Sequence, residues 1–181
     1  MINRIHILGA SGSGTSTLGK ALSEKLNYWH FDTDNYFWKP TNPPFQEKRI
    51  LEERQEILGR DLTKHKNWIL SGSLCGWGDI FIPYFDLVVF LWIPKELRIT
   101  MLIEREKSRH GEKIELKGNV YKQYKEFIEW ASQYDDGDLN MRSKKLHEKW
   151  LNDLPCKILK LEGEFELEDN IDRVLEIIKE A

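Results

Sequence analysis

Seven consecutive apolar residues at positions 87–93 (LVVFLWI) constrain the fold of this chain most strongly. A strand with one face in solvent alternates apolar and polar residues, whereas a strand covered on both faces is apolar throughout. Strands of the second kind are typical of parallel sheets between layers of helices. Pro94 follows the run directly, and proline is favoured in the first turn of a helix. The run therefore predicts a buried parallel strand followed by a helix.

The rest of the chain alternates between strand-like and helix-like runs. We expect strands at residues 4–8, 28–31, 68–70, 87–93 and 157–161. We expect helices at residues 17–26, 45–63, 95–108, 120–134, 141–151 and 168–179. This alternation predicts a parallel sheet with right-handed crossovers. At 181 residues the chain is most simply a single domain (1–181) with a substantial core.

A glycine-rich segment at residues 9–17 (GASGSGTST) joins the first predicted strand to the first predicted helix. It resembles the phosphate-binding pattern G-x-x-x-x-G-K-S/T, in which backbone amides cradle a phosphate, the lysine reaches the outer phosphates and the hydroxyl binds Mg²⁺. Thr15 stands at the lysine position, so the alternative is a turn that binds nothing. Its place between a strand and an anion-favouring helix N-terminus indicates a nucleotide site. The candidate binding residues are Gly9, Ser11, Gly12, Ser13, Gly14, Thr15, Ser16 and Thr17.

Two carboxylates, Asp32 and Asp34, directly follow the second predicted strand. Ligands of an open α/β sheet bind beyond the carboxyl ends of its strands, so this pair and the glycine-rich loop should share one crevice. A magnesium–nucleotide needs oxygen ligands, and a phosphate acceptor needs a base. We therefore expect Ser16 and Asp32 at the metal, and Asp32 and Asp34 in catalysis. The alternative is that both aspartates only form a turn or a helix cap.

Residues 109–151 interrupt the alternation between the fourth and fifth predicted strands. They open with a polar stretch that contains Gly111 and Gly118 and continue with two helical runs. We expect a mobile lid here, on a core formed by residues 1–108 and 152–181; a plain helical crossover is the alternative.

Arginines in and next to this insertion are candidates to replace the missing lysine. Arg98 and Arg105 are seven residues apart and share one face of a predicted helix, and Arg109 lies near that face. Arg142 lies beyond the polar stretch. A lid arginine that reaches a transferring phosphoryl group accelerates transfer about 10³–10⁵-fold. We therefore expect Arg105, Arg109 and Arg142 in catalysis, with a solvated salt bridge as the alternative for each.

The loop after the third predicted strand (71–79) carries glycines and hydroxyls but no carboxylate at Ser71. Glycines allow a substrate to approach the backbone closely, and hydroxyls offer uncharged hydrogen bonds. Trp38 and Trp77 lie on two strand-end loops, where they would stack on a planar or sugar-like substrate or pack in the core.

Composition excludes several other classes of protein. The net charge of −3, with both signs interspersed, argues against a nucleic-acid partner. No stretch of about 20 apolar residues is available to span a membrane, and the N-terminus lacks a signal-peptide pattern. Cys75 and Cys156 have no metal-ligand spacing and are typical of thiols in a reducing cytosol. We expect a cytoplasmic monomer or homodimer.

Together these motifs resemble the adenylate kinase-like superfamily of small-molecule kinases, which includes shikimate and gluconate kinases. The loop matches the family pattern except at Thr15, and Asp32-x-Asp34 matches the D-x-D that serves Mg²⁺ and the acceptor hydroxyl in shikimate kinase-like enzymes. Glu162-Gly163 stands where the family places its adenine-contacting loop. The resemblance implies a three-layer α/β/α P-loop NTPase fold with a five-stranded parallel sheet and a helical lid insertion, with ATP and Mg²⁺ as cofactors.

One departure from the family bears on the acceptor. Nucleoside monophosphate kinases carry a G-F/Y-P-R-like turn after the third strand, and its arginine holds the acceptor phosphate. This chain has residues 72–76 (GSLCG) there, without an arginine. An uncharged or polyol-like acceptor fits better, because a phosphate needs a cation or convergent amides. Three arginines of the second predicted helix remain as alternatives for holding a phosphate: Arg49, Arg54 and Arg60.

The leading hypothesis is an ATP-dependent phosphotransferase that acts on a small-molecule acceptor. The alternative is a nucleotide- or anion-binding module with weak or no catalysis, because Thr15 replaces the lysine. A lost charge-assisted hydrogen bond costs about 1.5–3 kcal/mol, or one to two decades in rate, which weakens catalysis without abolishing it. A third reading, an NTP hydrolase coupled to a protein partner, has no partner-binding signature in the sequence.

Overall fold

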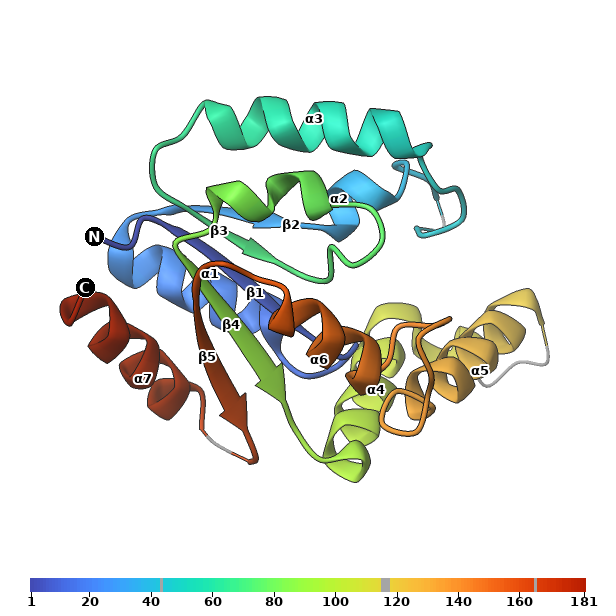
Figure 1. Ribbon diagram of the computed structural model, residues 1–181. Coiled ribbons are helices and arrows are strands. Elements are labelled where there is room, and N and C mark those ends of the chain that lie inside the picture. The colour runs from blue at the N-terminus through green and yellow to red at the C-terminus, as the bar shows by residue number, and fades with distance from the viewer. Residues whose placement is uncertain (43, 115–117, 165) are drawn as a thin grey trace.

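The computed structural model describes residues 1–42, 44–114, 118–164 and 166–181. Five parallel strands form one sheet in the order β2-β3-β1-β4-β5, with helices on both faces (Figure 1). The strands are β1 (Arg4–Gly9), β2 (Trp29–Asp32), β3 (Trp68–Ser71), β4 (Leu87–Trp92) and β5 (Lys157–Glu162). The predicted α/β fold with a five-stranded parallel sheet is confirmed.

The helices form two layers around this sheet. They are α1 (Thr15–Leu26), α2 (Asp34–Phe37), α3 (Leu51–Thr63), α4 (Lys95–His110), α5 (Asn119–Ser132), α6 (Lys144–Asn152) and α7 (Leu167–Lys179), with 3₁₀ turns η1 (Asp79–Tyr84) and η2 (Gly111–Ile114). Apolar residues of α1 and α7 pack in one core cluster with β1 and β4, and residues of α3, η1 and α6 pack in a second. The apolar run of β4 contributes to both clusters, since alternate residues face opposite layers.

The helix predicted to start at Phe45 begins six residues later, at Leu51. Phe45 has a φ of +64°, in the left-handed region, which a right-handed helix does not allow. The segment before α3 instead folds back on the end of α2, with an antiparallel bridge between Trp38 and Lys48 and a 2.8 Å hydrogen bond from Lys39 N to Glu47 O. This turn brings Phe45 and its neighbours to the carboxyl edge of the sheet.

Arg98 fastens α4 to the insertion. Its side chain is fully buried, with Nη2 2.5 Å from Asp135 Oδ2 and Nη1 donating to Ala131 O at 2.8 Å. Asp135 also accepts a hydrogen bond from Trp92 Nε1 at 2.8 Å. The shared helix face predicted for Arg98 and Arg105 therefore does not make Arg98 available to a ligand.

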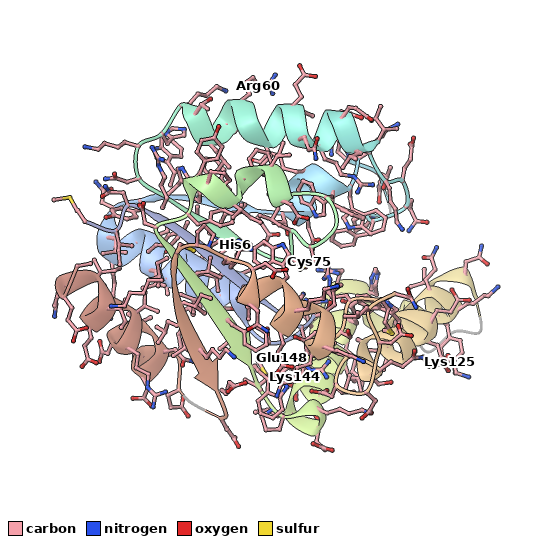
Figure 2. The ribbon with its side chains drawn as sticks, in the orientation of Figure 1. His6, Arg60, Cys75, Lys125, Lys144 and Glu148 are labelled. Atoms are coloured by element: carbon pink, nitrogen blue, oxygen red, sulfur yellow. The ribbon has the colours of Figure 1, made fainter. Side chains whose placement is uncertain are left out.

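The first part of the insertion lies beyond the carboxyl edge of the sheet, where α4 and α5 pack together and α5 projects away from the core (Figure 1). Its last part, α6, packs against the sheet in the core. Lys125, on α5, points outward into solvent (Figure 2). Residues 115–117 of the predicted lid lie outside the described residues. Within the described ranges, no helix has the length and apolar character needed to cross a membrane.

Candidate functional site

A cleft of about 950 Å³ opens at the carboxyl edge of the sheet, between the loop after β1, the ends of β2 and β3, and helices α4 and α5. The strand register brings these ends to one level: Asp32 pairs with Ser71, and Ser71 pairs with Ile7. The cleft gathers most of the predicted site residues, namely Gly9, Ser11, Gly12, Thr15, Ser16, Asp32, Asp34, Arg105, Arg109 and Arg142. The other predicted binding residues do not line the cleft: Ser13 is buried within the loop, Gly14 is half-buried, and Thr17 is exposed on α1.

The loop after β1 is shaped as an anion cradle. Ser13 fixes its turn, since its N and Oγ both donate to Ala10 O, at 3.1 and 2.9 Å. A Cβ on Gly9 would lie 2.3 Å from Leu91 O, so the loop can pack against β4 only with glycine there. Gly14 caps α1 with a φ of +91°, and the first turn of α1 contains no acidic residue. The first turn of α1 therefore brings no negative charge of its own to the amides of this helix N-terminus, and the carboxylate beside it is that of Asp32.

Asp32 links the loop to the second aspartate. Its Oδ2 accepts a hydrogen bond from Ser16 Oγ at 2.5 Å, and its Oδ1 accepts one from Asp34 N at 3.0 Å. A hydroxyl and a carboxylate oxygen are the ligand types that Mg²⁺ prefers, and Mg²⁺ in nucleotide sites takes only one or two of them from protein. Across the described ranges there is no cluster of three or more His, Cys, Asp or Glu side chains able to hold a metal. Ser16 and Asp32 thus fit a magnesium–nucleotide rather than a metal held by protein alone.

Asp34 occupies the first turn of α2 and reaches the cleft. Asp34 is exposed to solvent, yet the protein packed around its carboxylate raises its pKa, and the charge of Asp32 raises the pKa further. The cations Arg142, Arg105 and Arg109 partly oppose both effects. A carboxylate with a raised pKa takes up a proton more readily, which suits a general base.

The predicted arginines are held by a buried glutamate that sequence reasoning missed. Glu106 is 5% exposed and lies 3.2 Å from Arg105 Nη2, 3.1 Å from Arg109 Nη1 and 3.4 Å from His110 Nε2. The i, i+3 and i, i+4 spacing of Glu106 to Arg109 and His110 on one helix was the available signal. Glu106 keeps two guanidinium groups at the mouth of the cleft.

Aromatic side chains form the opposing surface of the cleft. Trp38 lines it, as predicted, together with Phe37, Phe45, Phe127 and Trp130. Three of these rings lie against the predicted arginines. The distance from the guanidinium carbon to the ring centre is 5.8 Å for Arg105 over Phe127, 5.1 Å for Arg109 over Phe45 and 5.6 Å for Arg142 over Trp130. Such cation–π pairs orient the guanidinium groups without neutralising their charge.

Trp77, the other predicted stacking residue, packs in the core instead. It is 6% exposed, and its Nε1 donates to Ser73 O at 3.1 Å. It reaches only a smaller cavity of about 390 Å³ that adjoins the cleft. The residues that border both spaces are Phe37, Lys48, Ser73, Trp130 and Arg142.

The arginines of the second predicted helix do not line the cleft. Arg60 projects from the outer face of α3 into solvent (Figure 2). Arg49 donates to Trp38 O, and Arg54 donates to Arg49 O at 2.7 Å while its guanidinium stacks on Phe37 at 3.8 Å. Two of these cations therefore hold the segment between α2 and α3 in place.

Glu162, from the predicted adenine-contacting pair, lies 3.8 Å from Lys144 Nζ at the end of β5 and is not part of the cleft lining. Adenine contact by this pair stays a prediction.

Comparison with known proteins gives relatives for most of the chain. Residues 5–126 match a protein family described as AAA domain. The uncharacterized protein YqaC of Bacillus subtilis is 50% identical over 178 residues, which cover 98% of each chain. A cytidylate kinase of Archaeoglobus fulgidus is 27% identical over 119 residues, covering 57% of this chain and 62% of the relative.

Two solved structures share the arrangement of strands and helices. Shikimate kinase from Acinetobacter baumannii in complex with shikimate superposes with a TM-score of 0.57 at 17% identity, covering 99% of this chain and 94% of the other. Deoxyadenosine kinase from M. mycoides superposes with a TM-score of 0.55 at 15% identity, covering 98% of this chain and all of the other (100%). At these identities the likeness establishes the fold.

Proposed function

The chain belongs to the AAA domain family and has the P-loop small-molecule kinase fold, and from this premise we propose that it is an ATP-dependent phosphotransferase acting on a small-molecule acceptor. YqaC, the relative with 50% identity, is uncharacterized, and the other three proteins named above are kinases of a nucleotide, a nucleoside and shikimate. Their names have kinase activity in common and differ in the acceptor that they state. We propose the shared activity for this chain and leave the identity of its acceptor open.

The observation that carries the proposal is the chain of contacts from Ser16 through Asp32 to Asp34. One carboxylate oxygen of Asp32 contacts the loop hydroxyl, and the other is bonded to the backbone of Asp34, at 2.5 and 3.0 Å. A phosphate-binding loop and a candidate base are thus connected through one side chain. A phosphotransferase needs such a candidate base beside its phosphate site, whereas a module that only binds nucleotide does not.

Each group has a role in the proposed reaction. Ser16 and Asp32 would hold Mg²⁺ on the phosphates of ATP, which supplies the transferable γ-phosphoryl group. The amides of the loop bind phosphate oxygens. The Asp34 carboxylate takes the proton of the acceptor hydroxyl. Arg105, Arg109 and Arg142 stabilise the negative charge of the transferring phosphoryl group, in place of the lysine that Thr15 replaces.

Contacts across the cleft support a lid formed by the end of α4 and by α5, whereas α6, the last part of the predicted insertion, packs in the core. Gln123 Nε2 on α5 donates to Gln46 Oε1 at 3.0 Å, and Arg109 at the end of α4 covers the ring of Phe45. Both contacts join the insertion to the segment before α3. Closure over bound ATP would exclude water and so favour transfer over hydrolysis.

The proposal is tested by ADP release with Mg·ATP and an acceptor panel of shikimate, gluconate, deoxyadenosine and CMP. We expect one class of acceptor to raise ADP release above the rate without acceptor. The competing function is a nucleotide-binding module, favoured by Thr15. Tight Mg²⁺-dependent ATP binding without turnover, together with activity gained by Thr15→Lys, would establish that second function instead.

A further inference from the structure

A chain of buried hydrogen bonds ends at the wall of the cleft. The Tyr134 hydroxyl lies 2.8 Å from His147 Nδ1, and His147 Nε2 lies 3.1 Å from Ser73 Oγ. The three residues are 2%, 0% and 5% exposed, respectively. They come from the turn after α5, from α6 and from the loop after β3, which also carries Cys75 (Figure 2). Only Ser73 borders the cleft and the smaller cavity.

The partners of His147 determine its tautomer. Burial and, to a smaller extent, the charge of Arg142 lower the pKa of His147 to about 3, so the ring is neutral at physiological pH. A neutral imidazole has one N–H donor and one acceptor nitrogen. Among the described residues the Tyr134 hydroxyl hydrogen has His147 Nδ1 as its acceptor. A proton on Nδ1 would leave that buried hydroxyl without an acceptor, so Nδ1 accepts and Nε2–H donates to Ser73 Oγ.

This arrangement leaves the Ser73 hydroxyl hydrogen available to a partner other than the ring, and Ser73 lines the cleft. Ser73 Oγ already accepts from His147, so its own hydrogen cannot be directed back at the ring. The neighbouring Cys75 thiol interacts with Ser73, yet sulfur is a weak acceptor. A substrate oxygen in the cleft is the stronger partner.

We propose that Ser73 is a substrate-binding residue whose hydroxyl donates a hydrogen bond to an oxygen atom of the phosphate acceptor, and that His147 and Tyr134 are positioning residues that fix the direction of this bond. The inference rests on the proposed function and deepens it. It assigns the acceptor an oxygen with a free lone pair (hydroxyl, carbonyl or carboxylate) at the carboxyl end of β3. A fixed donor also selects against acceptors that present a hydrogen-bond donor at this point.

Nitrogen NMR of the imidazole rings tests the tautomer in the full-length protein, without any activity. We expect His147 to carry its proton on Nε2, with the assignment made by the loss of its signals in His147→Gln. The matched control is His6, another fully buried histidine, whose Nδ1 lies 2.9 Å from Leu70 O and whose Nε2 has no partner among the described residues. His6 should therefore show the opposite tautomer. A proton on His147 Nδ1 would overturn the proposal.

Acceptor kinetics test the donor itself, with shikimate, CMP and deoxyadenosine as probes. Ser73→Ala should raise the KM of the phosphorylated probe about 3- to 10-fold, the equivalent of one neutral hydrogen bond, and change kcat less. Ser73→Thr keeps the hydroxyl and should restore the KM. Tyr134→Phe should raise the KM in the same direction, since His147 loses the donor that fixes its tautomer.

Tyr36→Phe is the matched control, because Tyr36 is also buried and its hydroxyl donates to Asp61 at 3.3 Å, away from the cleft. It should lower stability and leave the KM unchanged. Equal KM values for wild type and Ser73→Ala, or an equal effect of Tyr36→Phe and Tyr134→Phe, would overturn the proposal. If wild type phosphorylates none of the probes, the proposed function fails for these acceptors. The NMR measurement of the His147 tautomer then still shows whether the hydrogen bond to Ser73 runs in the proposed direction.

Discussion

Gly14→Ala separates the binding role of the loop from its contribution to stability. Gly14 has a φ of +91°, and a left-handed conformation costs a residue with a side chain about 1–2 kcal/mol. For a chain of this size each 1 kcal/mol lowers Tm by about 2–4 °C, so we expect a loss of about 2–8 °C. The added methyl would meet only Leu91 Cδ2, at 3.8 Å, which is an ordinary contact. The protein therefore tolerates the substitution and stays folded.

Binding of ATP should suffer far more. We expect the methyl to crowd a phosphate bound at the loop, so that at least one charge-assisted hydrogen bond to phosphate is lost. Such a bond is equivalent to about 1.5–3 kcal/mol, or roughly 10- to 150-fold in Kd. Isothermal titration calorimetry with Mg·ATP measures the loss, and differential scanning fluorimetry measures Tm.

Gly76→Ala is the matched control for this substitution. Gly76 has a φ of +79° in the loop after β3, and a Cβ there meets no atom within 4 Å. Both variants should therefore lose similar stability, but only Gly14→Ala should lose ATP affinity. Unchanged ATP affinity in Gly14→Ala, or an equal loss in both variants, would refute the assignment of the loop as the nucleotide site.

Three further predictions concern charges and stability. Asp34→Asn should be more stable than wild type at pH 7 and equally stable in strong acid. The pKa of Asp34 is raised in the folded protein, so wild type loses stability as the pH rises from 3.8, the pKa of the unfolded carboxyl group, through the pKa of the folded one. Urea unfolding at pH 7 and in strong acid checks this. Asp135→Asn should lower the free energy of unfolding, measured in urea, by about 3–5 kcal/mol, because the buried Arg98 charge loses its partner. Asp136→Asn removes an exposed ion pair and should lower it by less than about 1 kcal/mol. Equal losses in the two variants would contradict the anchoring role of Arg98. Burial lowers the pKa of His6 from 6.5 to about 4, so as the pH falls the unfolded chain binds a proton at this residue before the folded protein does. The free energy of unfolding should therefore fall by about 3 kcal/mol between pH 6.5 and pH 4, and it should depend less on pH in a His6→Leu variant.

The fold was predictable because its signals are local. The apolar run of β4 and the alternation of elements determine a parallel sheet whatever the details of packing. The strand-end rule then places the loop, Asp32 and Asp34 at one edge without any knowledge of side-chain contacts. Arg105, Arg109 and Arg142 could be nominated in the same way, and all three line the cleft.

The remainder depends on contacts between residues distant in sequence. Arg98 has the same helical spacing as Arg105, yet it is buried, because Asp135 lies 37 residues further along the chain and pairs with it. Phe45 reaches the cleft because its own backbone is left-handed, a conformation that no sequence pattern here predicts. His147 meets Ser73 across 74 residues of chain, so neither residue carries a signal of its own.

The central claim is that this cleft transfers the γ-phosphoryl group of ATP to a small-molecule acceptor with Asp34 as the base. Following a radiolabelled γ-phosphate from Mg·ATP into the acceptors of the panel tests it most directly. The account predicts label in an organic phosphate for wild type and a rate lower by about 10²–10⁴-fold for Asp34→Asn, with ATP binding retained. Label found only in ATP and inorganic phosphate, to the same extent in both proteins, would contradict it.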